Sequence, residues 1–121
     1  MELIRVGYWL GSTEPGWPDP RNFVDLSWNG DERAEVVLHL RQGAVAKRYM
    51  GLSECRFCGE LVGSLELSDG TYVWPEGLTH YVDQHGVRLP QSFVDHMSRA
   101  RDSLEDAVVD DSWWRSIKSW K

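Results

Sequence analysis

The pattern of hydrophobic and polar positions in the first third of the chain predicts a strand, a loop and a helix. Residues 3–10 alternate weakly between apolar and polar side chains, which is typical of a strand. Residues 11–22 contain three prolines and two glycines and predict an irregular loop. Residues 29–43 predict a helix, because Asn29 can cap its first turn and Gly43 suits its C-terminal end.

Strand character dominates the middle of the chain. Residues 44–51 are β-prone and lead into a pair of cysteines. Residues 63–75 predict a hairpin, since two β-prone runs flank Asp69-Gly70, a dipeptide that favours tight turns because glycine readily adopts positive φ. Tyr72 and Trp74 in this hairpin are expected to pack beside any metal site formed nearby.

The second half of the chain predicts three helices. They cover residues 76–86, 91–109 and 113–120, and the first of them ends at Gly86. The longest helix carries one continuous apolar stripe at three- and four-residue spacing, formed by Phe93, Met97, Ala100, Leu104 and Val108.

The composition describes an acidic globular chain of one-domain length. Its 121 residues include seven tryptophans, and 19 acidic against 13 basic residues give a formal charge of −6. Phosphate backbones repel such a charge, which weighs against nucleic-acid binding. Neither a signal peptide nor a membrane-spanning run is recognisable, so the predicted location is the cytoplasm.

Cys55 and Cys58 form a Cys-x-x-Cys-Gly motif that three interpretations fit. In a zinc knuckle, a tight turn aims both thiolates at one point, and Gly59 lets backbone amides approach the sulfurs. A thioredoxin-like redox pair would need a helix N-terminus to lower the thiol pKa, whereas a glycine and a predicted strand follow here. In the third interpretation, the two cysteines are ordinary buried residues that only pack in the core. A close pair in a reducing compartment more often binds metal, so the zinc knuckle is preferred.

His80 and His85 are the candidate partners of the cysteines, because structural zinc takes four ligands. The order of knuckle, hairpin and helix is that of a treble-clef or a long ββα finger. Residues five apart lie roughly 140° apart around a helix, so both histidines meet one ion only if the helix loosens near Gly86. If it does not, the replacement ligand comes from the remaining acidic and imidazole side chains, namely His96, Glu60, Asp69 or, least favoured, His39.

Recognisable catalytic motifs are absent. The zinc-deaminase signature needs His-x-Glu ahead of Pro-Cys-x-x-Cys, whereas here the cysteines come first. The His-Glu-x-x-His, P-loop, dinucleotide-binding and Gly-x-Ser-x-Gly motifs do not occur either. Four protein ligands would make a closed structural site that contributes folding free energy. If one histidine is not a ligand, water would take its position, as in a metal-dependent hydrolase.

The C-terminal segment SWWRSIKSWK is rich in aromatic side chains. Trp113, Ile117 and Trp120 share one side of a helix, with Trp114 next to them. Packing of this side on the protein's own sheet is the preferred interpretation. The alternative is an exposed anchor for a protein partner, because tryptophan and arginine are enriched at interface hot spots.

The motifs CRFCG and DGTYVWPEGLTHYV resemble those of a family of small bacterial cytoplasmic proteins without an established activity. The likeness covers residues 23–43 and 55–96 and leaves out the C-terminal segment. It implies a bacterial, cytoplasmic origin and places the cysteine pair and His80 in one module.

These observations predict an α+β fold for a single domain over residues 1–121. A small antiparallel sheet with three to four helices would carry a zinc-knuckle or treble-clef-like module at residues 53–86, followed by C-terminal helices at residues 90–120. The predicted function is a zinc-stabilised, non-enzymatic adaptor for a protein partner, for instance an immunity-type protein. The alternatives are a metal-dependent hydrolase with an open zinc site and a nucleic-acid-binding zinc finger.

Overall fold

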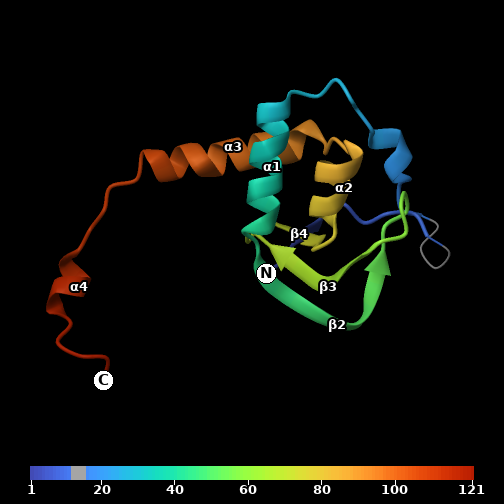
Figure 1. Cartoon of the computed structure of the whole chain (residues 1–121). Coiled ribbons are helices and arrows are strands. Elements are labelled where there is room, and N and C mark those ends of the chain that lie inside the picture. Colours follow the sequence, from blue (N-terminus) through green and yellow to red (C-terminus); the bar gives the residue numbers. More distant parts are fainter. Residues whose placement is uncertain (12–15) are drawn as a thin grey trace.

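The computed structural model describes residues 1–11 and 16–121, so part of the loop predicted for residues 11–22 lies outside the described residues. A four-stranded sheet in the order β1-β4-β3-β2 lies below a group of helices (Figure 1). This arrangement confirms the predicted α+β class.

Three strands of the sheet follow one another along the chain as an antiparallel meander. They are β2 (Ala44–Glu54), β3 (Leu61–Ser68) and β4 (Tyr72–Pro75). The first strand, β1 (Ile4–Arg5), pairs in parallel with β4, so the sheet is mixed and not purely antiparallel. Sequence periodicity reports strand character but not strand direction, which depends on a partner far along the chain.

The predicted N-terminal strand is much shorter than expected. Pairing with β4 stops after Arg5, although the backbone N–H of Val6 still donates to the carbonyl of Val73 at 3.0 Å. Gly7 adopts a φ of 75° and lies against the side chain of Leu78, where a Cβ atom would be 2.4 Å from a methyl carbon. The chain therefore turns away from the sheet at Gly7.

The four α-helices lie within a few residues of where the sequence places them, and a 3-10 helix forms at the end of the segment predicted as a loop. A 3-10 helix spans Pro20–Phe23, and the α-helices are α1 (Gly30–Arg41), α2 (Leu78–His85), α3 (Gln91–Glu105) and α4 (Ser112–Ser116). The side chain of Asn29 caps α1 by accepting hydrogen bonds from the backbone N–H groups of Asp31 and Glu32. Within residues 1–11 and 16–121, no helix is both long and apolar enough to cross a bilayer.

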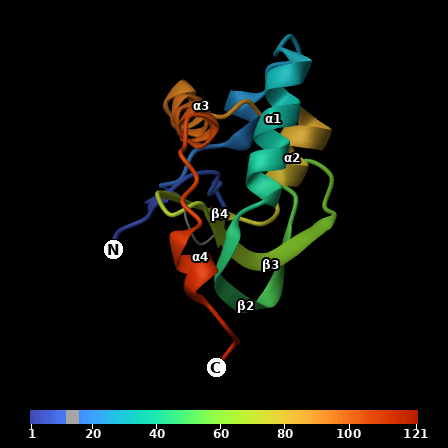
Figure 2. The same ribbon diagram turned by 90° about the vertical axis from the view of Figure 1, so that its left-hand side faces the viewer.

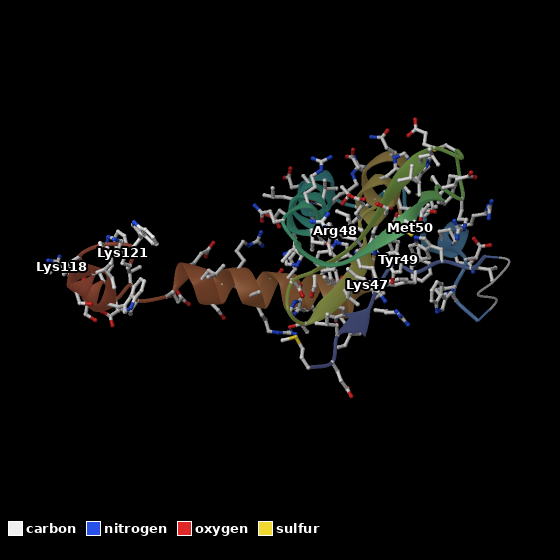
Figure 3. The ribbon with its side chains drawn as sticks, turned by 90° about the horizontal axis from the view of Figure 1, so that it is seen from below. Lys47, Arg48, Tyr49, Met50, Lys118 and Lys121 are labelled. Atoms are coloured by element: carbon white, nitrogen blue, oxygen red, sulfur yellow. The ribbon has the colours of Figure 1, made fainter. Side chains whose placement is uncertain are left out.

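The hydrophobic core lies between the sheet and helices α1, α2 and α3. Its largest fully buried side chain is Trp74 of β4, which donates its indole N–H to the carbonyl of Leu40 at 3.2 Å. Other core side chains come from all three helices and include Val36, Leu78, Val82 and Phe93. The outer strand β2 is exposed along its whole length, and Figure 3 shows Lys47, Arg48, Tyr49 and Met50 along this strand.

The apolar stripe predicted for the longest helix is buried only in its first half. Phe93 and Met97 are buried, but Leu104 and Val108 are 77% and 94% exposed. Figure 1 shows why: α3 runs past the edge of the body, and α4 stands apart from the sheet.

Candidate metal centre

Cys55, Cys58, His80 and His85 form one cluster in the structure. One ligand atom from each residue can be chosen so that all four lie within 4.8 Å of one another. The Cys58 Sγ atom is 3.3 Å from His80 Nε2, which is 3.2 Å from His85 Nε2. Two sulfurs and two imidazole nitrogens form a donor set suited to a tetrahedrally bound ion such as zinc. The cluster can hold a metal ion.

The two cysteines lie on a tight turn that joins β2 to β3. The N–H of Cys55 donates to the carbonyl of Glu60 at 2.8 Å, and the N–H of Gly59 donates to the carbonyl of Cys55 at 2.9 Å. Gly59 has a φ of 75°, which a residue with a Cβ rarely adopts. The N–H of Phe57 also approaches the Cys55 sulfur at 3.4 Å. The knuckle predicted from the sequence therefore has a backbone that turns both sulfurs toward α2.

The two histidines meet because α2 ends in a wide turn. The N–H groups of Gly86 and Val87 both donate to the carbonyl of Tyr81, beyond the four-residue spacing of an α-helix. A wider turn rotates less per residue, so it reduces the angle between His80 and His85. Helical side chains also lean toward the N-terminus, which directs the His85 ring back toward His80. The helix loosens near Gly86, which is the condition under which both histidines can meet one ion.

Side chains around the cluster fix its orientation. The hydroxyl of Tyr81 accepts the N–H of Arg56 at 2.9 Å and also interacts with the side chain of Cys55. The ring of Phe57 stacks on His85 with 4.7 Å between ring centroids. The Glu60 carboxylate lies 3.7 Å from His80 Nδ1, on the opposite side of the ring from Nε2. Such outer contacts orient metal ligands and select the imidazole nitrogen that faces the ion.

The pKa shifts of two cluster side chains act in opposite directions on metal binding. Desolvation and the neighbouring His80 lower the pKa of His85, which keeps its imidazole in the neutral form that binds metal. The backbone of Glu60 lowers the pKa of the Cys58 thiol, but desolvation and the Cys55 side chain outweigh this effect and raise the pKa. A bound cation would reverse this balance by offsetting the charge of both thiolates.

The replacement ligands named from the sequence do not join this cluster as metal ligands. Glu60 lies behind His80, and the other three side chains, from His39, Asp69 and His96, form a second cluster of their own. Sequence reasoning missed this second cluster, because its members are 27 and 30 residues apart and belong to three different elements. The one local feature of the sequence that involves this cluster is the predicted turn at Asp69-Gly70.

Tyr72 and Trp74 do not pack where the sequence analysis places them. Tyr72 lies against His96, with 5.0 Å between ring centroids, and Trp74 lies against His39 at 5.8 Å. Both aromatic rings therefore border the second histidine cluster. The alternation of side chains along β4 turns these two residues toward the helices that carry His39 and His96.

The described surface has cavities, but they do not open onto the full set of four ligands. A cavity of about 510 Å³ is lined by Tyr8, Trp17, Glu66 and neighbouring residues, and by none of the four. A hollow of about 360 Å³ beside α2 includes His80 and Glu60 but neither cysteine nor His85. Neither cavity places a substrate-sized space against the whole cluster.

The C-terminal tryptophans lie in solvent. Trp113, Trp114 and Trp120 are 71%, 68% and 90% exposed, and every residue from Arg101 to Lys121 is exposed. The preferred interpretation, packing of this segment on the protein's own sheet, is therefore wrong for this structure. The physical reason is that α3 carries the segment beyond the edge of the body before α4 begins (Figure 1).

Comparisons of the chain with protein-family models, with curated proteins and with solved structures give no match. The resemblance of the CRFCG and DGTYVWPEGLTHYV motifs to a bacterial family stays a prediction.

Proposed function

We propose that the protein is a small interaction domain whose knuckle and second helix are held together by one structural Zn²⁺ ion. The observation that carries the proposal is the convergence of two sulfurs and two imidazoles from the β2–β3 turn and α2. Zinc suits this donor set better than magnesium or calcium, which prefer oxygen ligands. The four-donor set also weighs against a hydrolase, because a catalytic zinc keeps one position for water or substrate.

The metal assignment is tested by measuring the metal content of the purified full-length protein. We expect one zinc equivalent in this centre, and we expect Co²⁺ substitution to give a thiolate-to-cobalt charge-transfer band. His80→Gln should weaken this band and lower the zinc affinity strongly. His96→Gln is the matched control, since it makes the same change outside the cluster and should leave the band intact. A protein without this band, or with the same band in His80→Gln, would overturn the assignment.

The interaction role is supported by an aromatic segment that the fold leaves uncovered. Trp113 and Trp114 lie side by side, with 6.2 Å between ring centroids, and neither is buried by the rest of the chain. Large exposed aromatic side chains next to an arginine are typical of protein–protein hot spots. The acidic charge of −6 makes a basic protein surface the best complement. An immunity-type protein that neutralises a basic toxin is one concrete form of this role.

This role is tested by capturing partners from the native cell extract with the wild-type protein and with the Trp113→Ala/Trp114→Ala variant. We expect a specific protein partner that the double variant fails to retain. Leu104→Ala is the matched control, because Leu104 is also exposed and apolar but lies on α3 outside the aromatic segment. Equal capture by all three proteins would exclude the tryptophans as the contact site.

A further inference from the structure

His39, Asp69 and His96 converge from three separate elements on one carboxylate oxygen. His39 lies on α1, His96 lies on α3, and Asp69 lies in the turn between β3 and β4. The Nε2 atoms of both histidines are 2.8 Å from Asp69 Oδ2. Figures 1 and 2 show α1 and α3 next to each other above the sheet. The cluster shares no residue with the cysteine-containing centre.

The turn fixes the orientation of the Asp69 carboxylate before any ligand binds. Its Oδ1 atom accepts the backbone N–H groups of Thr71 at 3.0 Å and Tyr72 at 2.8 Å. This leaves Oδ2 directed at the two histidines. Burial raises the pKa of Asp69, but the Tyr72 and Thr71 amides and both imidazoles lower it to about 2. The carboxylate is thus an anion held in place by the backbone.

Aromatic side chains hold the two imidazoles from behind. His39 contacts the rings of Trp74 and Phe93, each with 5.8 Å between centroids, and His96 contacts Tyr72 at 5.0 Å. Trp74 and Phe93 are fully buried, so this wall belongs to the rigid core. The side chains of His39 and His96 are both 20% exposed and that of Asp69 is 12% exposed. The three side chains are therefore held by the core and remain partly exposed to solvent.

We propose that His39, Asp69 and His96 form a second metal site, which binds a divalent first-row transition ion such as Zn²⁺ or Co²⁺. Two imidazole nitrogens and one carboxylate oxygen, all within 4.8 Å of one another, are a donor set that such ions bind. With three protein ligands, the remaining coordination positions fall to water, so this ion exchanges more readily than one held by two thiolates. The proposal does not depend on the identity of the metal in the cysteine-containing centre.

Metal at this site would tie α1, α3 and the β3–β4 turn together. Beyond Met97, α3 has no buried side chain and pairs with α1 through Arg101 and Glu35 at 3.0 Å, and it carries the exposed C-terminal segment. His96 lies next to Met97, at the point where the helix leaves the body. An ion bound at His96 would therefore fix the base of the helix that projects the tryptophans.

The test loads the full-length protein with one equivalent of Zn²⁺, which fills the cysteine-containing centre, and then adds Co²⁺ alone. We expect a second equivalent to bind, with visible cobalt absorption but without a thiolate charge-transfer band. The imidazole NMR signals of His39 and His96 should broaden or shift, while those of His80 and His85 stay unchanged. The melting temperature should rise with Co²⁺ concentration, because the ion binds the folded state.

Asp69→Asn and His96→Gln should each weaken binding of the second equivalent at least about tenfold. Asparagine keeps an Oδ1 acceptor for the Thr71 and Tyr72 amides, so the turn should fold in Asp69→Asn; an unchanged far-ultraviolet circular dichroism spectrum checks this. Asp95→Asn is the matched control. It removes the same charge next to His96, but Asp95 is exposed, its carboxylate accepts a hydrogen bond from Gln91, and it does not belong to the cluster, so cobalt binding should be unchanged.

Two results would overturn the proposal. The first is a zinc-loaded wild-type protein whose His39 and His96 signals and melting temperature do not respond to Co²⁺. In that case the two histidines only donate hydrogen bonds to Asp69. The second is full binding of the second equivalent by both Asp69→Asn and His96→Gln, which would place the ion elsewhere. Neither result bears on the assignment of zinc to the cysteine-containing centre, because that assignment is tested by the thiolate-to-cobalt charge-transfer band.

Discussion

At the scale of single residues, Tyr81 links the hydrophobic core to the cysteine-containing centre. Its ring is buried and packs against Trp9 and Phe57, with centroid distances of 5.7 Å and 5.9 Å. Its hydroxyl holds the backbone of the knuckle at Arg56. Burial is the main reason why the pKa of Tyr81 is raised, so the hydroxyl keeps its proton at neutral pH. Tyr81 therefore connects the packed core to the turn that carries the two cysteine ligands.

Tyr81→Phe tests this link, because it keeps the ring and removes only the hydroxyl. The N–H of Arg56 loses its acceptor, so we expect the free energy of unfolding to fall by about 1 kcal/mol. Metal affinity in the cysteine-containing centre should fall about 10-fold, as expected for loss of a contact that orients a ligand. Chemical denaturation and competition with a zinc chelator measure the two effects. Tyr49→Phe is the control, since Tyr49 is exposed on β2.

At the scale of elements, α2 shows how a helix end becomes part of a site. Residues 76–86 predict a helix that stops at Gly86, and the structure places α2 at Leu78–His85 with Gly86 in the left-handed conformation at a φ of 65°. The core face of α2 is formed by Leu78, Tyr81 and Val82, while His80 and His85 point to the knuckle. The same wide turn that ends the helix brings its two histidines together.

Gly86→Ala should disturb both the helix end and the metal centre. A left-handed conformation costs a residue with a Cβ about 1 kcal/mol, and the new Cβ would lie 3.1 Å from a methyl carbon of Leu26. We expect a loss of about 1 kcal/mol in the free energy of unfolding and weaker metal binding through His85. Gly51→Ala is the control, because a Cβ at Gly51 meets nothing within 4 Å. Equal stability of the two variants would show that the turn at Gly86 is not strained by alanine.

Element prediction succeeded where the signals are local. The cap at Asn29, the turn at Asp69-Gly70 and the stop at Gly86 all act over a few residues, and each marks an element end in the structure to within a few positions. It failed for the strand at residues 3–10, and although α3 forms as far as Glu105, the apolar stripe on its second half is uncovered. There, the outcome depends on whether a distant surface is available for packing, and the apolar pattern alone cannot tell a covered stripe from an uncovered one.

At the scale of the whole molecule, the chain divides into a packed body and a C-terminal extension. The buried side chains of the described residues all lie at or before Met97. Among the described residues, the hydrogen bonds and ion pairs of the extension (residues 107–121) stay within it, apart from the Ala107 N–H, which donates to the carbonyl of Leu104. The extension therefore contributes little to the stability of the body. Its aromatic side chains are exposed to solvent, and Figure 1 shows the extension projecting away from the sheet.

Deletion of residues 107–121 should leave the body folded and keep metal binding. We expect the melting temperature to change by no more than about 2 °C, because no buried apolar area is lost. Partner capture should be abolished, since the deletion removes Trp113, Trp114 and Trp120. A large fall in melting temperature would mean that the extension packs on the body in solution, as the sequence pattern had suggested.

The sequence by itself determined the local chemistry of this protein. It placed two cysteines on a tight turn, two histidines on the next helix and the elements in the order of an α+β fold, because caps, turns and motif spacing act over a few residues. Only the tertiary structure decided the parallel pairing of β1, the exposure of the tryptophans and the meeting of His39, Asp69 and His96. These features depend on contacts between residues tens of positions apart, and such contacts are set by how the helices pack on the sheet.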